Sequence, residues 1–292
     1  ADLQQWVQAG PPWDTTPHGE VNVTVHPDGT LLLLNYKDAA MYRGEWTWFE
    51  QVCRGLIVDA HTGEIVARPF DKFWNWGEGG RVGNGQIKCV TEKLDGSLGI
   101  LYRHDGTYKI ATRGSFDSAQ ALWATERLQQ YDLRAIPEEL TLLFEIIYPD
   151  NRIVVDYGGY EGLVLLAARD RFSGKYLELH ETERIGQRLD CETVRRYVIY
   201  SRADIETTLA AAKLLNANQE GFVVEMADGT RWKVKGERYV EIHRLVTQAS
   251  FRRVVETVRD GTIDDVCARI PDELRGDIDI WRAEIEAIVR DT

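Results

Sequence analysis

The sequence of 292 residues contains few cysteines and no long hydrophobic run. Its four cysteines lie far apart and form no Cys-x-x-Cys pair, which argues against a disulfide framework or a cysteine zinc site and favours a reducing, cytoplasmic compartment. No apolar stretch approaches the roughly 20 residues that a membrane span needs. The first residues, ADLQQWVQAGPPW, lack the basic start and apolar core of a signal peptide. We therefore expect a soluble protein with no membrane contact, and no segment points to an obligate protein partner.

Basic residues are also in the minority, with 35 Lys and Arg against 47 Asp and Glu, so the formal net charge is -12. A protein that coats nucleic acid is normally basic, so this balance argues against that class. It is compatible with an enzyme that acts on nucleic acid through a local basic face. The segment from 231 to 259 is locally basic and is either such a face or the ordinary scatter of charge on a helix surface.

The first 240 residues alternate between short apolar segments and turns that contain glycine. These patterns predict strands and tight turns in residues 21–36, 55–68, 86–112, 140–148, 163–170 and 220–235, and helices in 117–131, 180–189 and 203–215. From about residue 240 the strand patterns end and helical spacing continues. The predicted fold class is therefore α+β, with a domain of antiparallel sheets over residues 1–240 and a small all-helical C-terminal region over residues 241–292.

The segment EKLDGS places Lys93 at the end of a predicted strand, directly before a tight turn that contains Asp95 and Gly96. A lysine in this position can hold its amine near a phosphate. The same string of residues is also typical of an ordinary hairpin turn, so the segment alone does not decide between the two.

Other short motifs accompany this segment in a fixed order. They are CRGLIVD (53–59), RPFDKFWNW (68–76), TRGS (112–115), LLFEIIYPDNRIVV (142–155), EGFVVE (220–225) and WKVKGERY (232–239). The succession resembles the covalent nucleotidyltransferase superfamily of ligases and capping enzymes over roughly residues 50–240. The Arg-Gly pair ahead of a Lys-Phe-aromatic-Asn segment, and the Glu followed by Asn-Arg-Ile-Val, resemble the T4 RNA ligase 1 family most closely. The resemblance implies that the antiparallel sheets form a ligase adenylation domain.

The resemblance also implies roles for individual residues. Lys93 is expected to attack the α-phosphate of ATP and form lysyl-AMP, with Lys233 and Lys235 as further catalytic lysines. The residues expected to bind the nucleotide are Arg54, Lys72, Trp74, Glu92, Asp95, Gly96, Arg113, Glu145, Glu220, Lys233 and Lys235. The carboxylates expected to hold Mg²⁺ or Mn²⁺ are Asp95, Glu145 and Glu220. The aromatic rings in residues 72–75 either stack on a base or pack in the core.

The chemistry requires this combination of residue types. A lysine amine is ordinarily protonated at pH 7 and cannot attack, so neighbouring cations are needed to favour its neutral form. Displacement at phosphorus places negative charge on the phosphoryl oxygens, which a divalent cation and basic side chains stabilise. Carboxylates then hold the hydrated cation.

The resemblance implies an ATP-dependent RNA ligase that joins 5′-phosphate and 3′-hydroxyl RNA ends through lysyl-AMP and RNA-adenylate, in the repair of broken RNA such as nicked tRNA. The region after residue 240 is shorter than the C-terminal domain linked to tRNA preference in the enzyme that names the family, which weakens the inference of a tRNA substrate. A DNA ligase or a capping guanylyltransferase shares the lysine chemistry, but each normally carries a β-barrel after the catalytic domain. A non-catalytic RNA-binding relative is the remaining alternative.

Overall fold

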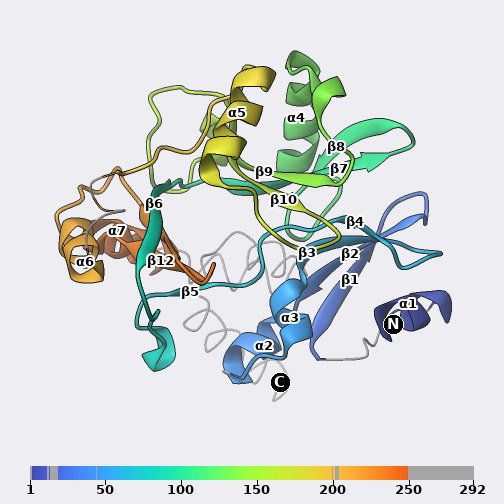
Figure 1. Ribbon diagram of the computed structural model, residues 1–292, viewed down its shortest axis with the longest axis horizontal. Coiled ribbons are helices and arrows are strands. Elements are labelled where there is room, and N and C mark those ends of the chain that lie inside the picture. The colour runs from blue at the N-terminus through green and yellow to red at the C-terminus, as the bar shows by residue number, and fades with distance from the viewer. Residues whose placement is uncertain are drawn as a thin grey trace, which may run out of the picture.

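The computed structural model describes residues 2–11, 13, 19–43, 45–198, 200 and 204–248. Within these residues the chain forms three four-stranded sheets with helices packed around them (Figure 1). Neighbouring strands are antiparallel except for one short parallel pair, so the predicted α+β class with antiparallel sheets is confirmed. No helix among the described residues is long and apolar enough to cross a membrane.

The N-terminal sheet has the strand order β1-β2-β3-β4. Its strands are β1 (Val21–Val25), β2 (Leu31–Tyr36), β3 (Arg54–Asp59) and β4 (Ile65–Ala67). Alternate residues of β2 face two separate cores, since Leu31 and Leu33 pack in one cluster and Leu32 and Leu34 in another. A strand covered on both faces needs apolar residues at every position, which explains the run of four leucines.

The second sheet has the order β10-β9-β7-β8. Its strands are β7 (Ser97–His104), β8 (Thr107–Ala111), β9 (Leu140–Ile147) and β10 (Gly162–Asp170). The helices α4 (Ala119–Arg127) and α5 (Leu179–Leu189) cover one face of this sheet, as Figure 1 shows. Residues such as Leu142, Phe144 and Leu165 fill the core between the sheet and these helices.

The third sheet has the order β5-β12-β11-β6. Its strands are β5 (Trp74–Asn75), β6 (Ile87–Lys93), β11 (Gly221–Met226) and β12 (Arg231–Lys235), and α6 (Ile205–Lys213) packs against β12. The following helix α7 (Glu237–Gln248) continues through residue 240, where we predicted a domain boundary. The rest of the predicted helical region, residues 249–292, lies outside the described residues, so that division of the chain stays a prediction.

The strands on either side of the EKLDGS segment belong to different sheets, so reading the segment as a hairpin turn is wrong. Strand β6 pairs with β11 in the third sheet, whereas β7 pairs with β8 and β9 in the second. The three residues Leu94–Gly96 carry the chain across. Gly96 lies so close to β9 that a Cβ atom there would be 2.6 Å from the carbonyl oxygen of Ile146, which only a glycine avoids. The local sequence resembles that of a hairpin, but it does not determine the strand partners, because packing beyond the turn sets them.

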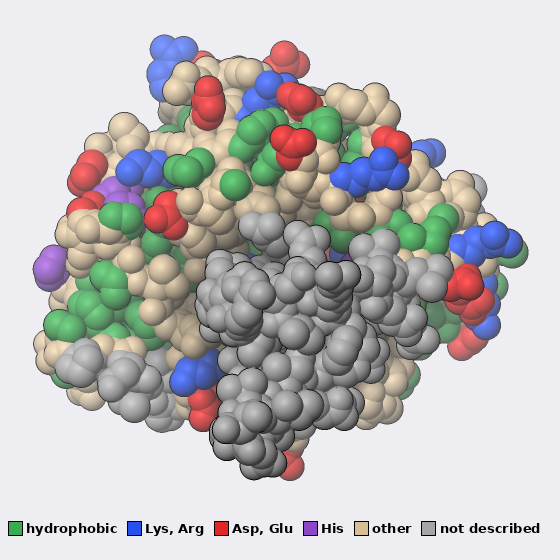
Figure 2. Space-filling model, turned by 180° about the vertical axis from the view of Figure 1, so that it is seen from behind, with side chains coloured by type: hydrophobic (Ala, Val, Ile, Leu, Met, Phe, Trp, Pro, Cys, Tyr) green, Lys and Arg blue, Asp and Glu red, His purple; other side chains and the backbone are tan. Residues whose placement is uncertain are grey.

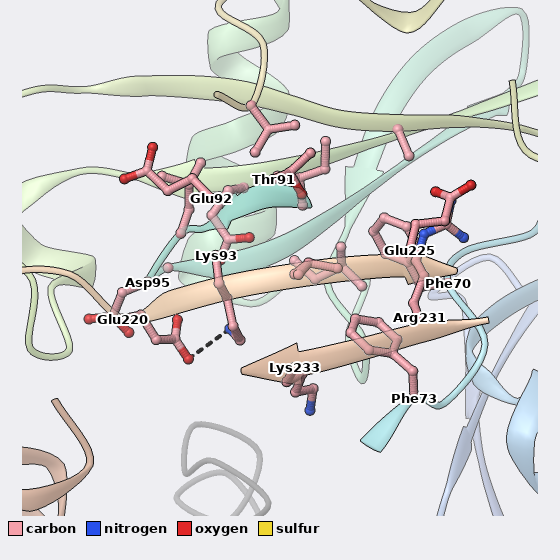
Figure 3. A pocket seen from close by; sticks show the side chains of 18 of the residues that line it. Phe70, Phe73, Thr91, Glu92, Lys93, Asp95, Glu220, Glu225, Arg231 and Lys233 are labelled. Carbon is pink, nitrogen blue, oxygen red and sulfur yellow. Dashed lines mark hydrogen bonds and ion pairs between the residues drawn. The ribbon is translucent and has the colours of Figure 1, made fainter. Parts of the chain in front are cut away.

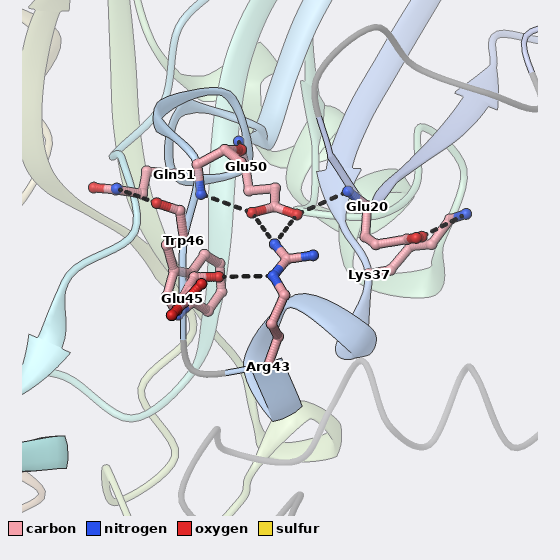
Figure 4. Close-up of polar contacts among 8 residues, drawn as sticks. Glu20, Lys37, Arg43, Glu45, Trp46, Glu50 and Gln51 are labelled. Atoms are coloured by element: carbon pink, nitrogen blue, oxygen red, sulfur yellow. Dashed lines mark hydrogen bonds and ion pairs between the residues drawn. The ribbon is translucent and has the colours of Figure 1, made fainter.

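Short helices lie beside the N-terminal sheet, and a buried carboxylate, Glu50 of the third of them, bonds to the second helix and to the residue before β1 (Figure 4). The helices are α1 (Asp2–Gln8), α2 (Asp38–Arg43) and α3 (Trp48–Val52). Arg43 of α2 donates to both oxygens of Glu50 at 2.6 Å, and the backbone nitrogens of Glu20 and Thr47 donate at 2.8 Å. Burial by itself would raise the pKa of Glu50, but these donors outweigh it and lower the pKa. Because α3 leads directly into β3, Glu50 also fixes where Arg54 starts that strand.

We expect the substitution Glu50→Gln to destabilise the fold by about 1–3 kcal/mol, because the amide keeps one acceptor oxygen but turns an NH₂ group toward donors that the buried carboxylate satisfies. The urea dependence of unfolding measures this difference. Glu20→Gln is the matched control, since Glu20 forms an exposed pair with Lys37 at 3.2 Å and such pairs contribute about 1 kcal/mol or less. Equal unfolding midpoints for the two variants would contradict the role given to Glu50.

Candidate active site

Strand register brings two lysines to one carboxylate in the third sheet. Gly221 at the start of β11 pairs with Lys93 on one side and with Lys235 on the other. The residue before it, Glu220, therefore lies between the two lysines. Its Oε1 atom is 2.7 Å from Lys93 Nζ and 3.0 Å from Lys235 Nζ. The Glu220 side chain is 3% exposed and that of Lys235 8%, whereas Lys93 at 20% keeps access to an incoming molecule.

These side chains open into a cavity of about 230 Å³ between the second and third sheets. Figure 3 shows Lys93 directed toward Glu220 at one end, and Phe70, Glu225 and Arg231 at the other. An apolar wall between the two ends is formed by residues that include Leu98, Leu166, Leu177, Val194 and Val223. A cavity with an apolar wall and a few charged groups at its ends is typical of a site for an organic ligand with a charged part.

Three further basic side chains line the same cavity, two of them from segments outside the third sheet. They are Arg54 at the start of β3, Arg113 in the turn after β8, and Lys233 on β12. Gly55, at φ +89°, lets β3 approach the turn, since a Cβ atom there would lie 3.2 Å from Arg113 Cα. This explains the Arg-Gly pair of the sequence motif. The Nη1 atom of Arg54 is buried and has no hydrogen-bond partner in the described part of the chain, so it is available to an anion.

Asp95 has its carboxylate oxygens occupied by the protein. Its Oδ2 accepts from the backbone nitrogens of Val154 and Val155, each at 2.8 Å, and its Oδ1 accepts from the Tyr239 hydroxyl at 2.8 Å. The Asp95 backbone nitrogen donates to the Tyr157 hydroxyl at 2.7 Å. These bonds argue against the predicted role of Asp95 as a metal ligand. They make it a positioning residue that ties the segment after Lys93 to the 149–157 loop and to α7.

The two remaining carboxylates respond differently to burial. Burial raises the pKa of Glu145 to about 8, and the nearby Lys93 lowers it only in part. Burial would also raise the pKa of Glu220, but its ion pairs with Lys93 and Lys235 outweigh burial and lower the pKa. Glu145 is therefore largely neutral at pH 7 and Glu220 is ionised. A divalent cation at Glu145 would supply the positive charge that its ionised form lacks.

We expect the stability of the metal-free protein to fall between pH 6 and 8.5, and Glu145→Gln to remove much of that fall. The pKa of Glu145 is raised in the folded protein. Its contribution to the stability of the fold is therefore fully present below about pH 4.5 and is lost as the pH rises to about 8. Urea unfolding in EDTA at pH 6 and at pH 8.5 gives the loss of unfolding free energy between the two pH values. We expect this loss to be about 2 kcal/mol larger in the wild type than in the variant. Parallel pH profiles for the two proteins would show that Glu145 does not titrate in this range.

Comparison with known proteins decides the family. A sequence profile described as RNA ligase, of the T4 RNA ligase 1 type, matches residues 52–240. The chain belongs to this RNA ligase family. The matched region includes each motif residue described above and ends within α7.

Individual relatives in this family match different shares of the chain. A putative bifunctional polynucleotide kinase/RNA ligase of Autographa californica nuclear polyhedrosis virus is 27% identical over 86% of this chain and 39% of its own length. A putative RNA ligase of Thermovibrio ammonificans is 29% identical over 66% of this chain and 53% of its own. The chain thus spans between two fifths and about half of these relatives. A solved Naegleria gruberi RNA ligase mutant with ATP and Mn is 23% identical over 55% of this chain and 52% of that one, with a TM-score of 0.43.

The structure gathers most of the predicted nucleotide-binding residues into one cavity. They are Arg54, Glu92, Lys93, Asp95, Gly96, Arg113, Glu145, Glu220, Lys233 and Lys235. Glu92 lines the cavity from the strand position next to Lys93, and burial raises its pKa, opposed by Arg195. Figure 3 shows its carboxylate directed away from the Lys93 amine.

Two predicted residues, Lys72 and Trp74, do not line the cavity. Lys72 is buried, with its Nζ 5.3 Å from the ring of Trp46, and Trp74 packs against the core of the third sheet. The aromatic side chain that enters the cavity from this segment is Phe73, whose ring lies 5.4 Å from Lys233 Nζ. Side chains of neighbouring residues in an extended segment point to opposite faces, so Phe73 enters the cavity while Lys72 and Trp74 point away from it.

Sequence reasoning also missed residues that complete the cavity. Phe70 and Arg231 form its far end, with the Arg231 guanidinium 5.5 Å from the Phe70 ring. Tyr157 and Tyr239 hold Asp95 in place. Phe70 and Tyr239 lie in the motifs 68–76 and 232–239, but an uncharged residue type does not by itself indicate a place in the site. Arg231 belongs to the locally basic segment 231–259, which the sequence did not connect to the cavity.

Proposed function

We propose that the chain is an ATP-dependent RNA ligase that joins a 5′-phosphate end to a 3′-hydroxyl end. The observation that carries the proposal is the pair of lysines on Glu220, at one end of a cavity with an apolar wall and further basic residues. Lys93 is the more exposed of the two and is the nucleophile. Lys235 is held deeper, where its charge can act on a bound phosphate.

In the first step the Lys93 nitrogen attacks the α-phosphorus of ATP, an N–P bond forms, and the bond to pyrophosphate breaks. The amine must lose a proton before it attacks. The second cation, Lys235, lies on the same carboxylate oxygen and places a further positive charge beside the incoming phosphates. The buried Nη1 of Arg54 and the side chains of Arg113 and Lys233 face the charge that develops on the phosphates.

Glu145 and Glu220 are the residues that would hold a divalent cation, Mg²⁺ or Mn²⁺. Glu145 fits such a cation because burial keeps its carboxyl largely neutral until a positive charge stabilises the ionised form. When bound, the cation neutralises charge on the phosphoryl oxygens.

Two further displacements complete the reaction. An oxygen of the RNA 5′-phosphate attacks the AMP phosphorus and releases the Lys93 amine, and the RNA 3′-hydroxyl then attacks the activated 5′-phosphate and releases AMP. Acidic and basic side chains are interspersed on the face that Figure 2 shows. With a net charge of -12, RNA binding therefore depends on the local basic groups around the cavity. Repair of broken RNA in the cytoplasm, including tRNA, is the role we propose for this activity.

Labelling and sealing experiments test the proposal. The protein is incubated with α-labelled ATP or α-labelled GTP, and then with 5′-phosphorylated strands of RNA or DNA. We expect label on the protein from ATP and joining of RNA. Label from GTP alone would favour a capping-type nucleotidyltransferase, and joining of DNA but not RNA would favour a DNA ligase. RNA binding without label from either nucleotide would favour a non-catalytic relative.

A further inference from the structure

The tips of two hairpins from different sheets meet at a group of three side chains away from the cavity. His26 and Asp28 lie in the turn between β1 and β2, and His104 ends β7. Asp28 Oδ1 is 2.7 Å from His26 Nδ1, and Asp28 Oδ2 is 2.5 Å from His104 Nε2. The two imidazole rings are 4.5 Å apart between centroids. Nothing in the proposed ligation chemistry uses these residues.

We propose that His26, Asp28 and His104 form a binding site for Zn²⁺. Imidazole nitrogen and carboxylate oxygen are both zinc ligands, at about 2.0–2.2 Å from the metal, which places ligand atoms roughly 3.3 Å apart in a tetrahedron. The three candidate ligand atoms lie within 4.8 Å of one another. Small rotations of the side chains therefore suffice to surround an ion. In the absence of the metal, hydrogen bonds hold the same atoms together, and zinc would replace the protons that those bonds contain.

The surroundings support a site that is ordered before the ion arrives. The backbone nitrogen and the hydroxyl of Thr30 donate to Asp28 Oδ1 at 2.9 and 2.7 Å, which fixes the carboxylate as a second layer of contacts does in metal sites. Both histidines are shielded, with side-chain exposures of 10% for His26 and 7% for His104. The Phe116 ring packs edge-on against His26, with 4.9 Å between centroids.

The fourth position of the site faces solvent. The Asp105 carboxylate is 84% exposed and lies 3.4 Å from His104 Nε2, so either this carboxylate or water can complete a tetrahedron. Three protein ligands of this kind favour zinc over Mg²⁺, which prefers six oxygen ligands and retains water. The site is thus chemically distinct from the carboxylates of the cavity.

Zinc bound here would connect the N-terminal sheet to the second sheet. Next to the group, the Thr24 hydroxyl donates to the carbonyl oxygen of Gly114 at 3.2 Å. Gly114 follows Arg113, which lines the cavity. We therefore expect the metal to stabilise the junction that supports Arg113, without taking part in the chemistry.

Metal analysis and thermal unfolding test the inference. The wild-type protein is incubated with Zn²⁺ in excess Mg²⁺, which competes for the carboxylates of the cavity, and is then desalted. We expect about one Zn²⁺ per chain, and a rise of about 5 °C in the unfolding midpoint when Zn²⁺ is added to the metal-free protein. His104→Ala and Asp28→Asn should each weaken binding at least tenfold, and circular dichroism checks that each variant folds.

His61→Ala is the matched control, because His61 is an exposed histidine in a neighbouring turn. It should retain the zinc and the thermal shift. Binding that is absent in the starting protein, or that persists in a folded Asp28→Asn protein, would overturn the proposal and leave the group as a hydrogen-bonded cluster. The experiment measures metal content and thermal unfolding, so its outcome does not depend on ligase activity.

Discussion

A Lys93→Ala protein should take up no adenylate from α-labelled ATP, yet should still join RNA that already carries a 5′-adenylate. The substitution removes the only atom that forms the N–P bond in the first step, whereas the last step makes no bond to lysine. We expect labelling to fall by more than ~10³-fold, as for the loss of other enzymatic nucleophiles. Gel electrophoresis of the labelled protein and of the RNA products measures both effects.

The matched control is Lys88→Ala on the same strand. Lys88 forms ion pairs with Glu178 and Glu225 at 2.8 and 2.9 Å and does not line the cavity. Its loss should leave labelling within about twofold of wild type, because such partly exposed pairs contribute little. Label retained by Lys93→Ala would assign the nucleophile to another lysine, with Lys235 first in line.

The second large effect is expected for Glu220→Gln, which removes the negative charge between Lys93 and Lys235. Two cations then lie side by side, one of them with 8% exposure. We expect adenylate labelling to fall by about 10² or more, because the geometry of the lysines depends on this carboxylate. We also expect a loss of about 3 kcal/mol in the free energy of unfolding, as when one partner of a buried ion pair is removed.

The contribution of Glu220 to stability should decrease in acid. The folded pKa of Glu220 is lowered, so the stability from its ion pairs is present above about pH 4.5 and is lost as the pH falls through the folded value. Glu220→Gln should therefore differ most from wild type at neutral pH and least in acid. Glu178→Gln, at a carboxylate that is 52% exposed, is the control for a general effect of charge. Equal acid sensitivity in wild type and Glu220→Gln would contradict the role of the shared carboxylate.

The sequence predicted local elements well where turn chemistry and apolar patterns agree. The hairpin of β11 and β12 is one example, because EGFVVEM and TRWKVK flank an Ala-Asp-Gly turn and do pair. The order of motifs also predicted Lys93, Glu220 and Lys235 as site residues, and the structure places their side chains in contact. Their convergence on one carboxylate oxygen follows from strand register. The order of several motifs can indicate which residues share a site, because it reflects the whole fold and not a single turn.

Strand partners could not be read from local patterns. The segment from β6 to β7 has the composition of a hairpin, and the two strands enter different sheets because each finds a better partner farther along the chain. Partner choice depends on contacts between residues that are far apart in sequence, whereas propensity and periodicity describe only neighbours.

The roles of individual side chains were also beyond the sequence. Asp95 is an acidic residue two positions from the nucleophile, which suggested a metal ligand, but its oxygens accept from Val154, Val155 and Tyr239. Those donors are 59 to 144 positions away. Which acidic residue meets a metal and which braces the backbone is decided by such distant donors.

The short connection between β6 and β7 has a consequence for how related genes can vary in length. Three residues span two sheets, and Gly96 has no room for a side chain against Ile146. An inserted codon would move Lys93 relative to Glu145 in the other sheet, while a deletion would leave the chain too short to cross. We therefore expect insertions and deletions among related sequences to collect in exposed turns such as 227–230, and residues 93–97 to keep a constant length.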